Sequence, residues 1–316
     1  MSDRGRRRVW CEFARADEVV RSGLLAALAE RRIALLFAVT PGDERDALAI
    51  VKACRAASVE IGLWPMLAPE RGRWANELTA HELSAFVAGL FASLASEGAL
   101  PDELAIDLEP PFDLLARRDV ASLVAFARGR RHGGSERLAA LATEARERGL
   151  RVLAATLPVV LADGPEARLQ RLLATPLSVL GEAHVSVMMY SSLVEGYAGR
   201  ALDRADVRAL TFEVARRAAR RRDHGLSLGA IATGALGDEA VYPSPEELAD
   251  DVAIASCAGV RDLALFSLCG VLRRGDATRW LDAFLTEHKS CAPSRTWRAD
   301  LAIRALDALG GARATP

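Results

Sequence analysis

Lysine is nearly absent from this chain of 316 residues, in which the basic residues are almost all arginine. The only two lysines, Lys52 and Lys289, do not end a predicted strand. A Schiff-base mechanism, which needs a lysine amine in the site, is therefore not indicated. The formal net charge is −1, so the chain has no charge excess that would attract nucleic acid or an acidic membrane. We expect neither of them as a partner.

Cysteine motifs and long apolar runs are also missing. The five cysteines are odd in number and widely spaced, without a CxxC motif, which is typical of free thiols in a reducing compartment. The basic residues Arg6–Arg8 lead into Val9–Glu12 rather than into the apolar segment of a secretory signal. No segment has the apolar length of a membrane helix. These features predict a soluble, cytoplasmic protein.

Glycine-rich phosphate turns and histidine clusters are lacking as well. No early strand is followed by the glycine-rich turn of a dinucleotide-binding sheet. His184 starts a predicted strand, and the other four histidines fall in predicted helices or loops: His81, His132, His224 and His288. We therefore expect no cofactor and no bound metal.

Short apolar runs do alternate with longer amphipathic segments along the whole chain. Eight runs are rich in Val, Ile, Leu and Ala, as expected for parallel strands that are covered on both faces. They span Arg8–Phe13, Ile33–Val39, Val59–Pro65, Leu104–Leu108, Arg151–Thr156, His184–Tyr190, Ser227–Ala232 and Asp262–Leu268. Eight strands, each followed by a helix, predict an α/β fold, the (β/α)8 TIM barrel.

The strand–helix repeat fills the chain, so we expect residues 1–316 to form a single barrel domain. Residues 1–7 are expected to form a flexible tail. The segment Arg128–Ser135, rich in arginine and glycine, is expected to be a surface loop between two helices. Residues 296–316 are expected to form an extra C-terminal helix and a tail, because Thr296–Leu309 is amphipathic.

The most informative segment is Leu104–Pro111, which reads LAIDLEPP. Alternate side chains of a strand point to the same side, so Asp107 and Glu109 share one face. Two carboxylates held close at the end of a buried strand cannot both ionise freely, and one is pushed toward the neutral, proton-donating form. The segment therefore predicts an acid–base site, because barrel enzymes place their sites at the carboxyl ends of the strands.

Other candidate site residues follow the ends of the remaining strands. The chain has only three tyrosines and five tryptophans, yet several of these rings fall at the same predicted end of the barrel. Aromatic planes around a carboxylate pair are typical of sugar-binding sites, since the C–H faces of a sugar stack on them. Besides the acid–base candidates Asp107 and Glu109, the candidate site residues are thus Tyr190 and, for substrate binding, Glu12, Trp64, Trp74, Ser191, Tyr242 and Phe266.

The segment ending in Asp107 and Glu109 resembles the fourth-strand signature DGxDxDxE of glycoside hydrolase family 18, the chitinase-like barrels. The segment Val187–Ser191 is similar to the MxYD segment of that family. The resemblance implies that Glu109 is the general acid, that Asp107 orients the N-acetyl group of the substrate, and that Tyr190 positions the acetamido oxygen. It implies a carbohydrate or glycoconjugate as the substrate.

The chain departs from this family pattern at several positions. Glu103 replaces the glycine of the signature and Ala105 replaces its middle aspartate, while Ser191 replaces the aspartate of MxYD. Phe266 lies near the place of the usual eighth-strand tryptophan. A two-carboxylate glycosidase, with Glu12 as a distant second carboxylate, therefore remains an alternative to the acetamido mechanism.

Two further functions stay open. The missing aspartates favour a catalytically silent barrel that binds carbohydrate or a protein partner. A divalent-metal sugar isomerase or lyase, in which Glu12, Asp107 and Glu109 hold Mg²⁺ or Mn²⁺, is the third alternative. The carboxylates could also be structural ion-pair partners of the many arginines. The segment Arg71–Trp74 has two interpretations, a loop that reaches over the site to bind an anionic group and a solvated loop, and we expect the second. We expect Cys11 and Cys269 to pack in the core.

Overall fold

A closed barrel of eight parallel strands forms the centre of the protein in this computed structural model, which describes residues 5–117, 122, 126, 133–199, 201–286 and 292–311. Each strand pairs with the next one along the chain, and β8 pairs with β1 to close the barrel. The strands are β1 Arg7–Cys11, β2 Ile33–Val39, β3 Ile61–Pro65, β4 Glu103–Leu108, β5 Arg151–Thr156, β6 His184–Met189, β7 His224–Gly229 and β8 Leu263–Phe266. The predicted (β/α)8 fold is confirmed.

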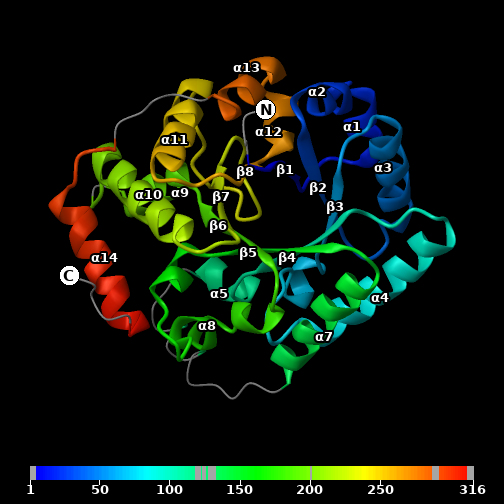
Figure 1. The fold of residues 1–316 in the computed structure, drawn as a ribbon, viewed down its shortest axis with the longest axis horizontal. Coiled ribbons are helices and arrows are strands. Elements are labelled where there is room, and N and C mark those ends of the chain that lie inside the picture. The colour runs from blue at the N-terminus through cyan, green and yellow to red at the C-terminus, as the bar shows by residue number, and fades with distance from the viewer. Residues whose placement is uncertain are drawn as a thin grey trace.

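Helices surround the barrel on all sides (Figure 1). The α-helices are α1 Ala16–Arg21, α2 Leu24–Arg31, α3 Glu44–Ala56, α4 Ala80–Ser96, α5 Phe112–Arg117, α7 Gly134–Glu147, α8 Arg168–Leu173, α9 Ser191–Ala198, α10 Arg204–Ala219, α11 Pro245–Cys257, α12 Leu268–Arg273, α13 Ala277–Phe284 and α14 Trp297–Gly310. Three short 3-10 helices are η1 Pro69–Arg71, η2 Pro158–Ala162 and η3 Leu177–Leu180. The predicted C-terminal helix is α14, which packs outside the barrel against α10 and α8. Among the described helices, none is long and apolar enough to cross a membrane.

The sequence predicted most strand ends to within a few residues. The bounds of β2 and β5 agree with the prediction. β7 begins at His224, three residues before the predicted strand, so the placement of His224 in a loop or helix was wrong. β1 begins at Arg7, within the tail expected over residues 1–7. Of the loop expected over 128–135, residues 128–132 lie outside the described residues, and α7 begins at Gly134.

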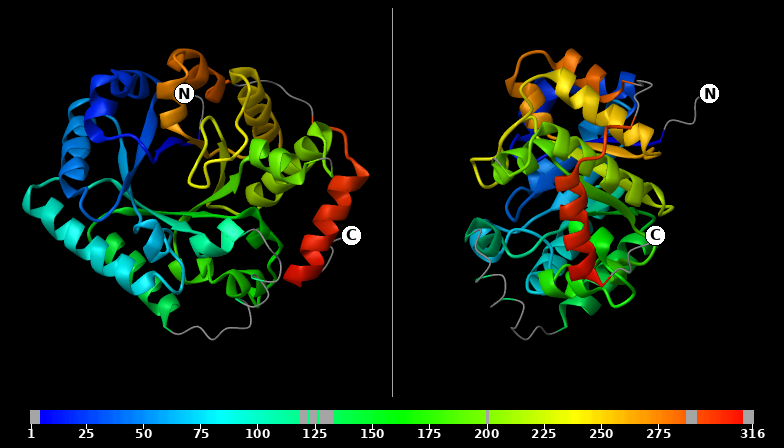
Figure 2. Two further views of the ribbon diagram at one scale, coloured as in Figure 1. Left: turned by 180° about the vertical axis from the view of Figure 1, so that it is seen from behind. Right: turned by 90° about the vertical axis from the view of Figure 1, so that its left-hand side faces the viewer.

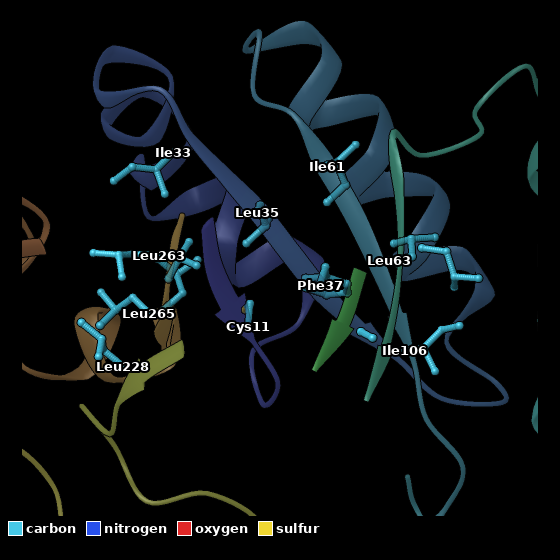
Figure 3. Packing of buried hydrophobic residues seen from close by; sticks show 14 of the residues in the cluster. Cys11, Ile33, Leu35, Phe37, Ile61, Leu63, Ile106, Leu228, Leu263 and Leu265 are labelled. Atoms are coloured by element: carbon cyan, nitrogen blue, oxygen red, sulfur yellow. The ribbon is translucent and has the colours of Figure 1, made fainter. Parts of the chain in front are cut away.

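The layer between the strands and the helices forms the larger hydrophobic core. Leu35, Leu63, Ile106 and Leu265, from four different strands, are each at most 2% exposed and point out of the barrel toward the helices (Figure 3). This layer explains why the strands are nearly continuous in apolar residues, since both of their faces are covered. Two cysteines of the chain, Cys11 and Cys269, are also buried in this layer, as predicted.

The barrel interior is polar at the amino ends of the strands and aromatic nearer their carboxyl ends. The buried Arg8 guanidinium bonds both carboxylate oxygens of Glu103, at 2.9 and 3.0 Å. One layer further along, the indoles of Trp10 and Trp64 meet edge to face, with ring centroids 4.9 Å apart. The Trp10 Nε1–H donates to Ser227 Oγ at 3.0 Å. Small interior side chains on other strands leave room for these two large rings: Ala38, Ala105, Ala155 and Ala264.

Candidate functional site

The carboxyl end of β4 holds the two central carboxylates of the candidate site. Asp107 follows the interior residue Ala105 by two positions and is 4% exposed. The backbone of Glu109 is fixed by the loop between β3 and α4: its N–H donates to Ala75 O at 3.3 Å, and its carbonyl accepts from Asn76 Nδ2 at 3.2 Å. The structure therefore brings the predicted pair together on a firmly held strand end.

Burial shapes the protonation of both carboxyl groups. Burial raises the pKa of Asp107 from 3.8 to about 8, and the charge of Glu12 adds to this effect. Burial also raises the pKa of Glu109 well above its ordinary value, with the charge of Asp107 as the next cause. The Arg73 guanidinium acts in the opposite direction on both groups. Burial thus favours the neutral form of Glu109, which is the form that donates a proton.

An ion pair between Glu12 and Arg73 lies beside these carboxylates. Arg73 Nη2 donates to Glu12 Oε1, and the two side chains are 12% and 3% exposed. Burial raises the pKa of Glu12 to about 7, although Arg73 lowers it. The Arg73 guanidinium also lies 5.9 Å from the Trp74 ring centroid and 6.0 Å from that of Phe112. The expectation of a solvated loop was therefore wrong for Arg73, because an acidic partner and two rings draw its side chain inward.

Tyr190 and Phe266, at the carboxyl ends of β6 and β8, form an aromatic wall of the candidate site. Their rings stack with centroids 5.3 Å apart and planes 24° from parallel. Burial raises the pKa of the Tyr190 hydroxyl well above its ordinary value, and the charges of Asp107, Glu109 and Glu12 raise it further. Tyr190 thus presents a neutral hydroxyl, which can donate a hydrogen bond, near the acidic residues.

The predicted tryptophans belong to the same interior cluster as Phe266. Trp64 and Trp74 are 3% and 5% exposed. Within the described ranges of the chain, the buried Trp64 indole N–H and the buried Asp107 Oδ1 have no hydrogen-bond partner. A buried donor and a buried acceptor that lack partners are what a bound polar molecule would satisfy.

Ser191 and Tyr242 were predicted to bind substrate, and the structure places their hydroxyls in a buried network around Asp251. Both are at most 1% exposed, and both hydroxyls donate to Asp251 Oδ2, in the case of Tyr242 at 2.7 Å. Arg204 completes this buried network with a contact of 3.5 Å to Asp251 Oδ1. These hydroxyls contact Asp251 of α11 rather than the β4 carboxylates, and their role in substrate binding stays a prediction.

Sequence reasoning missed several residues around the carboxylates. Trp10 alternates with Arg8 and Glu12 along β1, so the period of two could have placed it inside the barrel. Arg73 and Glu239 come from loops, where no periodicity indicates which side chains turn inward. Glu239 is 7% exposed and its charge acts on both Glu12 and Glu109.

A metal site is not formed by the acidic residues. Within the described part of the chain, no three His, Cys, Asp or Glu side chains group closely enough to hold a metal ion. Glu12, Asp107 and Glu109 are all described, so the ligand set that a metal-dependent isomerase would need is not assembled.

Comparisons with known proteins identify the fold. No protein-family model and no curated protein sequence matches the chain. Among solved structures, the class V chitinase from Nicotiana tobaccum is 12% identical with a TM-score of 0.50, covering 90% of this chain and all of its own. A GH18 chitinase from Cycas revoluta in complex with (GlcNAc)3 is 14% identical with a TM-score of 0.52, covering 88% of this chain and 99% of its own.

A third solved structure, GH5_18 from Bifidobacterium longum, is 10% identical with a TM-score of 0.53, and the match covers 83% of this chain and 70% of that one. Identities this low show a shared fold and not a shared activity. The resemblance to a chitinase-like barrel that the sequence predicted is therefore confirmed at the level of the fold.

Proposed function

We propose that this barrel hydrolyses a glycosidic bond, with Glu109 as the general acid. The observation that carries the proposal is the raised pKa of Glu109, a carboxyl group held at the end of a barrel strand beside Asp107. A raised pKa favours the protonated form of such a group, which can donate its proton to a glycosidic oxygen as the bond breaks. A general acid of this kind contributes about 10²- to 10⁴-fold to the rate.

The neighbouring side chains fit a sugar ring. Trp64, Trp74 and Phe266 offer apolar ring faces, and Tyr190 and Asp107 offer a hydroxyl donor and a free carboxyl oxygen. The solved chitinase that carries (GlcNAc)3 supports an N-acetylated sugar as the first substrate class to test. We infer that Asp107 and Tyr190 form hydrogen bonds to a polar substituent of the sugar while Glu109 protonates the leaving oxygen.

The test is a screen of purified protein against aryl glycosides, including N-acetylated ones. We expect turnover of at least one glycoside, and a loss of about 10²- to 10⁴-fold in kcat in Glu109→Gln. Glu147→Gln is the matched control, since Glu147 is an exposed residue of α7. If the protein hydrolyses a glycoside and Glu109→Gln does so equally well, the assignment of Glu109 is wrong.

A catalytically silent barrel that binds carbohydrate is the second candidate. The observation in its favour is Ala105, which is fully buried where the chitinase-like signature has its middle aspartate. Calorimetric binding of N-acetylated oligosaccharides, without turnover of any glycoside in the screen, would establish this function instead.

A further inference from the structure

The loop between β7 and α11, residues 230–244, is anchored to the barrel at both ends. The Ala230 N–H donates to Ser192 Oγ at 2.8 Å, and the Ser192 hydroxyl in turn donates to Ala240 O at 2.8 Å. The Tyr242 N–H donates to Ala230 O, also at 2.8 Å, and so closes the loop. The right-hand view of Figure 2 shows this loop, in yellow, extending beyond the barrel. Its base is therefore well fixed and can hold a side chain in place.

Glu239 is the acidic side chain that this loop turns inward. It is 7% exposed, and its Oε1 accepts the Leu236 N–H at 2.8 Å. Its Oε2 is buried and has no hydrogen-bond partner among the residues that the structure describes. A buried carboxylate oxygen without a partner is costly in free energy, and in native proteins it often has a functional reason.

The surroundings of Glu239 connect it to the aromatic wall. A Cβ atom placed on Gly234 would lie 2.9 Å from Glu239 Oε1 and 3.4 Å from Phe266 Cε1. The carboxylate and the Phe266 ring edge thus flank the same glycine. Phe266 ends β8, which lies opposite β4 in the order of the eight strands, so Glu239 lies on the β8 side of the site.

Charge interactions place Glu239 near the other carboxylates as well. Its negative charge raises the pKa of Glu12 and of Glu109. The carboxylate of Glu12 is already paired with Arg73, and burial raises the pKa of Asp107 to about 8. Neither of these two groups therefore offers an unpaired negative charge. Glu239 thus offers a carboxylate oxygen that no group in the described part of the chain contacts by a hydrogen bond.

We propose that Glu239 is the second catalytic carboxylate of this barrel and that its free Oε2 stabilises the positive charge that develops on the anomeric carbon. The inference rests on the proposed glycosidase function and adds to it a group that neither the chitinase-like signature nor the sequence pattern indicated. Glycosidases in general use such a pair, with one neutral carboxyl group and one anionic carboxylate on opposite sides of the scissile bond.

The test compares three variants on the aryl glycoside that the wild-type protein prefers. We expect Glu239→Gln and Glu239→Ala both to lower kcat by at least about 100-fold with little change in KM. The amide oxygen of Glu239→Gln can still accept the Leu236 N–H, so a group that only anchors the loop would tolerate this change. Normal turnover by Glu239→Gln, together with impaired Glu109→Gln, would overturn the inference and leave the proposed function intact.

Chemical rescue gives a readout that a structural role would not produce. In Glu239→Ala, sodium azide should restore turnover of a dinitrophenyl glycoside by at least about tenfold. An azide nitrogen bonds to the anomeric carbon while the carbon–oxygen bond breaks, and the electron pair leaves with the phenolate. A glycosyl azide detected by mass spectrometry supports the inference, whereas no rescue in a folded variant contradicts it. If the wild-type protein hydrolyses no glycoside, the proposed function fails and this inference fails with it.

Discussion

Replacing Asp107 by asparagine should stabilise the protein at alkaline pH. The amide has the size of the carboxyl group but never ionises, so it removes the cost of a buried charge. In the unfolded chain an aspartate ionises above its ordinary pKa of 3.8, whereas in the folded protein Asp107 keeps its proton up to about pH 8. The folded state therefore binds more protons between these two values, and the wild-type protein loses stability as pH rises through that window.

The size of this effect follows from the pKa of Asp107. A rise from 3.8 to about 8 corresponds to roughly 6 kcal/mol at 25 °C, because a tenfold change in proton affinity equals about 1.4 kcal/mol. Part of this free energy is shared with Glu12, whose charge helps to raise the pKa of Asp107. We therefore expect Asp107→Asn to gain about half of it, roughly 2–3 kcal/mol, above pH 8 and almost nothing near pH 4.

Urea denaturation of both proteins at several values between pH 4 and pH 9 measures this difference directly. Glu147→Gln, in which an exposed carboxyl group is lost, should follow the wild-type curve at every pH. A gain in Asp107→Asn that is the same at pH 4 and pH 9 would refute the reasoning, since the cause would then be something other than ionisation.

Four further substitutions test the packing and charge of the protein. Gly229→Ala would place a methyl group 2.9 Å from a backbone oxygen and 3.0 Å from the Tyr190 ring, and should lower the free energy of unfolding in urea by about 1–3 kcal/mol. Gly89→Ala adds a Cβ atom that meets open space in a helix, and should instead raise the free energy of unfolding by about 0.5–1 kcal/mol. Arg73→Met removes the cation that lowers the pKa of Glu12, so infrared titration should find that pKa above about 7, and an unchanged value would contradict the ion pair. Glu103→Gln leaves a buried arginine unpaired and should destabilise the protein by about 3–5 kcal/mol, whereas a loss below about 1 kcal/mol would mean that the pair contributes little.

Much of the fold follows from the sequence because the strands are buried on both faces. The runs Ile33–Val39 and Arg151–Thr156 carry this signal so strongly that both ends of each strand were predicted. The seventh strand was predicted too far along the chain, over Ser227–Ala232. Its first residues, His224 and Gly225, have no apolar side chain, and their strand conformation depends on pairing with β6.

The site was predictable only where it lies on a strand. Asp107 and Glu109 share one face through the period of two, and the structure brings both to the mouth of the barrel. The inward turn of Arg73 depends on contacts with Glu12 and with rings far along the chain. Glu239 is likewise fixed by a loop whose shape comes from tertiary hydrogen bonds, which local patterns do not encode.

The most direct test of Glu109 as the general acid uses glycosides that differ in the basicity of the leaving group. A poor leaving group, such as a phenol, needs a proton as the bond breaks, whereas dinitrophenolate leaves without one. The account predicts that Glu109→Gln loses about 10²- to 10⁴-fold in kcat/KM on the phenyl glycoside but less than about tenfold on the dinitrophenyl glycoside. An equal loss on both substrates would contradict the role of Glu109 as the proton donor.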